Sequence, residues 1–227
     1  KSISTLWALD YLRTVGSVNK VLIISPLSTL ERVWGDEIWK HFPHMTFAVV
    51  HGTQAQRIKL LKQDVDVYIL NHDGVKIKPL LNALKDRPDI DLVVVDEIAS
   101  FRNVNHRWKA LNEVINKQHP SRAWGLTGTP PPNEPTDAWA QCKLLVPERV
   151  TGSKRTFRDA VMRQVSQFKW VPRDNALDMV AQAMQPSIRF KREDCIDLPP
   201  VVFETRHAEM TDVQKKSYKL MAQKLAF

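Results

Sequence analysis

LVVVDEIAS, residues 92–100, is the stretch that most strongly indicates the fold of this 227-residue sequence. Its four consecutive apolar residues are typical of a parallel strand that is buried on both faces. Two carboxylates, Asp96 and Glu97, follow at the carboxyl end of that strand, where α/β sheets bind their ligands. Because acidic residues also occur at helix starts, a simple helix cap is the alternative for this pair. The stretch therefore predicts an acidic site at the edge of a parallel sheet.

Other apolar runs extend the same pattern along the chain. We expect strands at 21–25, 46–50, 66–70 and 122–127, and helices at 3–13, 30–41, 53–63 and 105–117. Trp34 and Trp39 are expected on one helix face, in the core. Strands that alternate with helices predict an α/β fold with a mainly parallel sheet.

The pattern changes after Leu145. We expect helices at 154–168, 174–185 and 211–227, with short strand candidates at 187–190 and 201–208. The predicted organisation is a sheet-containing lobe at 1–145, a helical extension at 146–200, and the start of a further connection at 201–227.

The composition favours a polyanionic partner. Lys and Arg number 33 against 25 Asp and Glu, a formal charge of +8. Such a surplus favours nucleic acid, and anionic membrane less strongly, although a basic face without such a partner is the alternative. No apolar run approaches the roughly 18 residues of a membrane span, so we expect no membrane partner. The cysteines, Cys142 and Cys195, form no CxxC pair, so we expect no zinc.

The acidic pair has the position of a Walker B element. Asp96 would hold the Mg²⁺ that bridges nucleotide phosphates, and Glu97 would orient and deprotonate the attacking water. Thr127, Gly128 and Thr129, in the stretch WGLTGTPPPN at 124–133, follow the next expected strand. Their hydroxyls and permissive backbone can reach the acidic pair or a phosphate, with an ordinary strand-to-helix turn as the alternative.

Taken together, these motifs resemble the Swi/Snf-type ATPases of helicase superfamily two. LTGTPPPN resembles the family's LTGTPxxN turn, and ISPLSTLERVWGDEIWKHF at 24–42 resembles its motif Ia. Three further stretches resemble family segments: SFRN at 100–103, FKREDCIDLPP at 190–200 and VQKKSYKLM at 213–221. The resemblance runs from the first residues to the last. It implies a RecA-like P-loop NTPase lobe with a C-terminal helical extension, from a motor that hydrolyses ATP with Mg²⁺ and moves along double-stranded DNA.

The resemblance also gives the opening dipeptide a meaning. Lys1 and Ser2 resemble the end of a GxxxxGK[ST] phosphate loop, whose glycine-rich half we expect upstream; a chance Lys-Ser start is the alternative. Lys1 would reach the β- and γ-phosphates, and Ser2 would ligate Mg²⁺ together with Asp96. The second RecA-like lobe of the same protein, which normally supplies arginines to the site, is not in this sequence. We therefore expect negligible ATPase activity from these residues alone.

DNA contacts follow from the same resemblance. They are expected at Ser25, Pro26, Leu27, Ser28, Asn71, His72, Arg102 and Asn103, with Lys109 as a further candidate. Such residues would grip phosphates rather than read bases, and a solvated polar side chain is the alternative for each. Ala99 departs from the family, which commonly has a polar residue there. A hydrogen bond from that position to the LTGTP turn is therefore ruled out.

Two other functions stay open at this point. One is a different superfamily-two motor, such as an RNA helicase or a restriction-enzyme motor subunit. The other is a non-catalytic nucleic-acid-binding module. The compact spacing favours the cytoplasm of a bacterium or phage-infected cell, with the nucleus as the compartment if the source is eukaryotic.

Overall fold

The computed structural model describes residues 1–116, 121–129, 133–190, 195, 197 and 202–225. The chain divides into two compact units, 1–187 and 188–227, which we describe separately. The predicted boundaries at 145 and 200 stay predictions. Several predicted features lie outside the described residues: Pro130 to Pro132, most of the segment 190–200, and the last residues of the helices expected to end at 117 and 227.

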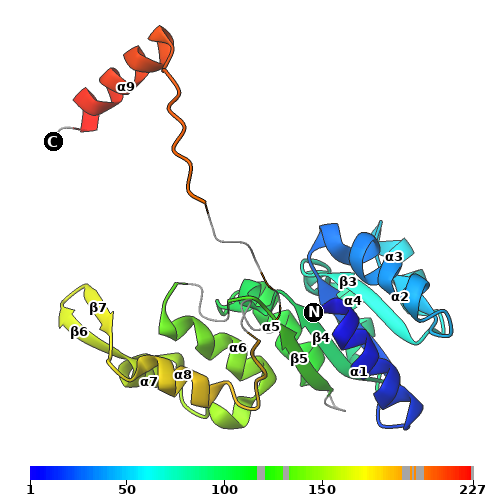
Figure 1. The fold of residues 1–227 in the computed structure, drawn as a ribbon. Coiled ribbons are helices and arrows are strands. Elements are labelled where there is room, and N and C mark those ends of the chain that lie inside the picture. The colour runs from blue at the N-terminus through cyan, green and yellow to red at the C-terminus, as the bar shows by residue number, and fades with distance from the viewer. Residues whose placement is uncertain (117–120, 130–132, 191–194, 196, 198–201, 226–227) are drawn as a thin grey trace. The chain divides into compact units, whose positions relative to one another are not determined.

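A parallel sheet is the centre of the first unit. Among the described residues, five strands pair in the order β2-β3-β1-β4-β5, and three of them, β3, β4 and β5, are labelled in Figure 1. The strands are β1 (Lys20–Ser25), β2 (Phe47–Val49), β3 (Val67–Asn71), β4 (Ile90–Asp96) and β5 (Arg122–Leu126). From β1 the chain crosses to the edge strand β2, returns to β3 and then continues past β1 to β4 and β5. The direction of the crossovers therefore reverses after β1, and ligands bind at such a switch point. This arrangement confirms the predicted α/β fold with a parallel sheet.

Helices cover both faces of the sheet. α1 (Ser2–Thr14) and α2 (Asp36–His41) pack on one face, and α3 (Gln54–Leu61), α4 (Lys78–Lys85), α5 (His106–Ile115) and α6 (Ala138–Leu145) pack on the other. In β4, Val94 packs in the apolar cluster on the face covered by α1 and α2. Val93 and Val95 pack in the cluster on the opposite face, which the other four helices cover. Successive side chains of a strand point to opposite faces, and this explains why β4 is apolar without interruption.

The segment between β1 and α2 is not a regular helix. A 3₁₀ turn (Leu27–Thr29) is followed by a wider π-helical turn (Leu30–Gly35), and only then does α2 begin. Trp34 is fully buried, but Trp39 is 76% exposed. The prediction that both belong to the core is therefore wrong for Trp39. Residues five positions apart lie about 140° apart around a helix, so they do not share a face.

The extension contains a hairpin where the sequence pattern predicted a continuous helix. α7 (Lys154–Val161) ends where β6 (Met162–Ser166) begins, and β6 pairs antiparallel with β7 (Lys169–Pro172). The predicted helix at 154–168 is therefore wrong beyond Val161. The Arg158 guanidinium lies 4.0 Å from the centre of the Trp170 ring and joins the helix to the hairpin. The helix predicted at 174–185 is confirmed as α8 (Ala176–Ala183).

In the second unit, α9 (Asp212–Leu225) confirms most of the helix predicted at 211–227. The strand candidates are wrong for the described residues 187–190 and 202–208, which form no strand. Each of these residues is exposed, and none is paired in a described ladder. β-branched and aromatic residues alone do not make a strand, because β propensity depends on packing against neighbouring strands.

Ion pairs fix the edge of the sheet where the strands begin. Two nitrogens of Arg87 bond the two carboxylate oxygens of Asp89, at 2.7 and 2.6 Å. Lys20 Nζ, at the start of β1, lies 3.2 Å from the same carboxylate. The hydrogen bonds from Arg87 hold the pKa of Asp89 at about 2, below its usual value. This edge is a structural anchor, opposite the edge that carries the acidic pair.

Candidate active site

Asp96 ends β4 at the carboxyl edge of the sheet, and both of its carboxylate oxygens are held. The Trp34 indole Nε1 donates to Oδ2 at 3.3 Å, and the Glu97 backbone N–H donates to Oδ1 at 3.1 Å. A carboxylate oxygen has more than one acceptor position, so each oxygen can still bind a cation. Asp96 is therefore oriented by its neighbours and remains able to act as a ligand.

Glu97 has an unusual backbone conformation. Its φ of 52° and ψ of 54° lie in the left-handed region, where residues other than glycine are uncommon. Within the described residues, it is the one non-glycine residue with positive φ. Such strain collects at functional sites, where the surrounding structure holds it in place.

The Glu97 side chain meets the first residue of the chain. Lys1 Nζ lies 2.8 Å from Glu97 Oε1, and both side chains are about half exposed. Lys1 precedes α1, and Ser2 is the first residue of that helix, whose first turn has no acidic side chain. The structure therefore brings the start of α1 to the acidic pair, across 96 residues of sequence.

The turn after β5 lies beside the acidic pair in the sheet. Leu126 is paired with Asp96, so Thr127, Gly128 and Thr129 continue from the neighbouring strand end. The Thr129 backbone N–H donates to Thr127 Oγ1 at 3.2 Å, an internal contact of this turn. Ala99 offers no polar side-chain atom toward it, as the sequence requires.

His72, the residue that follows β3, is buried and contacts the main chain of Asp96. His72 is 7% exposed, its backbone N–H donates to Ser25 O at 3.1 Å, and its Nε2 lies 2.8 Å from Asp96 O. Burial lowers the pKa of His72 despite that hydrogen bond, so we take the ring as neutral at pH 7. A carbonyl only accepts, so Nε2 carries the proton. Asn71 Oδ1 is likewise engaged, accepting from Arg57 Nη1 at 2.8 Å.

The other residues predicted to contact DNA differ in exposure. Ser25 is buried and Pro26 is partly buried, whereas Leu27 and Ser28 are exposed on the 3₁₀ turn. Beyond the acidic pair, Arg102 is partly buried, and Asn103 and Lys109 are exposed.

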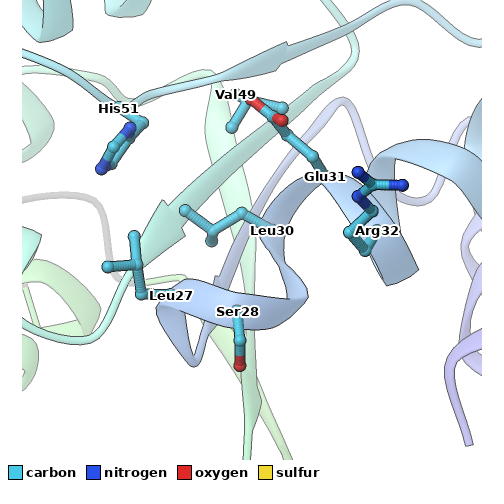
Figure 2. Close-up of a pocket in the computed structure, with 7 residues that line it drawn as sticks. All are labelled: Leu27, Ser28, Leu30, Glu31, Arg32, Val49 and His51. Atoms are coloured by element: carbon cyan, nitrogen blue, oxygen red, sulfur yellow. The ribbon is translucent and has the colours of Figure 1, made fainter.

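Leu27 and Ser28 line a shallow pocket of about 240 Å³ (Figure 2). Its other lining residues are Leu30, Glu31, Arg32, Val49 and His51. Arg32 and His51 were not predicted as site residues. Arg32 lies within the recognised motif at 24–42, which could have indicated it, but the sequence around His51 carries no comparable signal.

Comparison with known proteins decides the family. The family described as SNF2-related domain matches residues 1–227. This chain belongs to that family. It is 27% identical to the ISWI chromatin-remodeling complex ATPase ISW2 of Saccharomyces cerevisiae, over 99% of this chain and 20% of that protein. It is 26% identical to the ATP-dependent DNA helicase DDM1 of Arabidopsis thaliana, over 95% of this chain and 30% of that protein.

Solved structures of the SNF2 family show the same fold. The Sulfolobus solfataricus SWI2/SNF2 ATPase core in complex with dsDNA matches with a TM-score of 0.58 and 27% identity, over 70% of this chain and 31% of that chain. The Sulfolobus solfataricus SWI2/SNF2 ATPase core domain matches with a TM-score of 0.61 and 23% identity, over 99% of this chain and 44% of that chain. The predicted resemblance and the RecA-like fold are confirmed.

This SNF2-related chain spans about a fifth to a third of the two curated relatives named above. In the part of the chain that the structure describes, no helix has the length and apolar character needed to cross a membrane.

Proposed function

We propose that this SNF2-related chain is the ATP-binding lobe of a DNA translocase. The observation that carries the proposal is the 2.8 Å contact between Lys1 Nζ and Glu97 Oε1. It supports a single nucleotide site, because the lysine of one candidate motif meets the carboxylate of the other at the carboxyl edge of the sheet. Ligands of parallel α/β sheets bind at that edge.

The donor set fits ATP with Mg²⁺. Carboxylate and hydroxyl oxygens are the ligands that Mg²⁺ prefers, and Asp96 and Ser2 would hold the ion. Lys1 and the start of α1 offer positive charge and backbone N–H groups to the phosphates. The bound ion would supply neutralisation of the charge that develops on the phosphates.

The Lys1–Glu97 ion pair indicates how nucleotide binding would free Glu97, the proposed general base. A phosphate draws the Lys1 ammonium toward itself and so weakens the Lys1–Glu97 ion pair. The Glu97 carboxylate is then left to accept a proton from the attacking water. Thr127, Gly128 and Thr129 would border the phosphates on the β5 side.

DNA binding is the second half of the proposal. The predicted contacts Pro26, Leu27, Ser28, Arg102 and Asn103 are partly or fully exposed. Arg32 and His51 add basic groups beside Leu27 and Ser28. The formal charge of +8 suits a track of phosphates, and the solved Sulfolobus relative is described with dsDNA. Ser25, Asn71 and His72 have internal contacts, so we assign them to shaping this surface.

Other parts of the proposal concern the complete protein. We infer that a second RecA-like lobe of the same protein completes the ATP site, so residues 1–227 alone hydrolyse ATP negligibly. A cytoplasmic or nuclear location stays a prediction.

Glu97→Gln in the complete protein tests the catalytic assignment. General bases contribute about 10²–10⁴-fold, so ATP turnover should fall by about 10²-fold or more. Binding of a fluorescent ATP analogue should stay close to wild type, because the amide keeps the shape of the side chain. Glu113→Gln is the matched control, since Glu113 is an exposed residue of α5 that pairs with Lys85. Wild-type turnover by Glu97→Gln would exclude the proposed role, and stimulation by RNA instead of duplex DNA would favour an RNA helicase.

A further inference from the structure

The peptide unit between Asp96 and Glu97 is hydrogen-bonded at both ends. Its carbonyl, Asp96 O, lies 2.8 Å from His72 Nε2. Its N–H, on Glu97, donates to Asp96 Oδ1 at 3.1 Å. Rotation of this peptide plane would break both bonds together. The plane determines the φ of Glu97, and therefore where the Glu97 carboxylate points.

We propose that His72 is a positioning residue for ATP hydrolysis, which holds the Asp96–Glu97 peptide so that Glu97 keeps its left-handed conformation and faces the reacting water. This inference rests on the proposed function, since it assigns His72 a role in presenting the proposed base. His72 acts through the main chain of Asp96 and touches neither water nor nucleotide.

His72 is itself held firmly. Its backbone N–H donates to Ser25 O at 3.1 Å, so its main chain follows the end of β1. Its ring packs edge-on against Phe101, with ring centres 5.1 Å apart and an angle of 75°. Phe101 is fully buried in the turn that follows Glu97. A ring fixed on two sides can hold a strained peptide in place, whereas a mobile ring could not.

The backbone conformation of Glu97 explains why the Asp96–Glu97 peptide needs such a restraint. A left-handed residue other than glycine is unfavourable by itself and persists only where its surroundings impose it. The Asp96 carboxylate supplies one restraint, and His72 supplies the other from β3, 24 residues earlier in the chain. Trp34 restrains the Asp96 side chain but not this carbonyl.

Two amide substitutions of His72 separate positioning from packing. The Nε2 of a glutamine side chain takes nearly the same place as the histidine Nε2, whereas the amide of asparagine ends about one bond short of it. His72→Gln therefore keeps a donor for Asp96 O, and His72→Asn loses it. Both replace the ring with an amide and lose the contact with Phe101. Any effect of lost ring packing should be similar in the two variants.

Steady-state kinetics of the complete protein, with saturating duplex DNA, provide the test. We expect His72→Asn to lower kcat for ATP about tenfold, which corresponds to the loss of one buried hydrogen bond. KM for ATP should change less than about twofold, because uniform binding of nucleotide is retained. His72→Gln should recover most of the wild-type kcat, and thermal unfolding should place the two variants at similar midpoints.

Three results would overturn the positioning role. They are a wild-type kcat in His72→Asn, an equal loss of kcat in both variants, and a rise in KM with kcat unchanged. Glu97→Gln is measured in parallel. An inactive Glu97→Gln with a fully active His72→Asn would reject this inference and leave the proposed function standing, whereas an active Glu97→Gln would reject both.

Discussion

Glycine in place of Glu97 should give a more stable chain than alanine in the same place. In ordinary helix or strand backbone the order is the reverse, because glycine loses more conformational freedom on folding. Glu97 has φ 52° and ψ 54°, a conformation that glycine adopts without a steric penalty. Both substitutions remove the carboxylate and its contact with Lys1. The difference between the two variants therefore isolates the backbone.

The magnitude follows from two opposing effects. The left-handed conformation costs an L-residue about 1–2 kcal/mol. The greater freedom of unfolded glycine opposes this by about 0.5–1 kcal/mol. We therefore expect Glu97→Gly to exceed Glu97→Ala in free energy of unfolding by about 0.5–1 kcal/mol. For a chain of this size, that is a difference of about 1–4 °C in the melting midpoint.

Urea unfolding of the 227-residue chain, followed by tryptophan fluorescence, measures this difference. Glu113 is the matched control, because it lies in the right-handed backbone of α5. There the alanine variant should be the more stable one, by about 1 kcal/mol. If Glu97→Ala proved as stable as Glu97→Gly, or more stable, the left-handed conformation of Glu97 in solution would be refuted.

Two further substitutions test other parts of the molecule. Asp89→Asn should lower the free energy of unfolding by about 1–2 kcal/mol at pH 7, a value reduced from the full pKa shift because Asp89 is partly solvated. Its folded pKa of about 2 lies below the usual 3.8, so the contribution is present above about pH 4 and lost as pH falls toward 2. Urea midpoints across that range should converge with wild type, and a gap that persists at pH 2 would contradict the assignment. Gly125→Ala should destabilise the fold by about 1–3 kcal/mol, because the added Cβ would lie 2.5 Å from Leu145 Cδ1 and 3.2 Å from Ile98 Cγ2. Since Ile98 follows Glu97, ATP turnover should fall as well, and unchanged stability together with unchanged turnover would show that the contact relaxes freely.

The sequence predicted the structure best where an apolar run ends in polar or charged residues, as it does at 92–97. The run at 92–95 predicted a doubly covered strand, and it is the β4 core of the parallel sheet. The polar residues expected at strand ends do lie at the carboxyl edge, since parallel strands bring their ends together whatever their spacing in sequence. By that rule the strand pattern alone predicts that Asn71 and Asp96 lie at the same edge, and both end their strands there.

Contacts between distant segments were not predictable in the same way. His72 is 24 residues from Asp96, and Trp34 is 62 residues from it, so no local pattern links them. His72 was predicted as a DNA contact because the family resemblance places DNA contacts in the segment that follows the strand at 66–70. Its burial depends on how β3 packs beside β1 and on the position of Phe101. The hairpin at 162–172 was missed because pairing between strands decides β structure more than local propensity does.

Steady-state ATP turnover by the complete protein, titrated with duplex DNA in the presence of Mg²⁺, tests the central claim most directly. A site built from Lys1, Ser2, Asp96 and Glu97 in a DNA translocase predicts turnover that rises with duplex DNA and saturates. The same titration with Glu97→Gln should stay near the background rate. Turnover that is absent at saturating DNA, or that does not respond to DNA, would contradict the assignment of these residues to a DNA-driven ATP site.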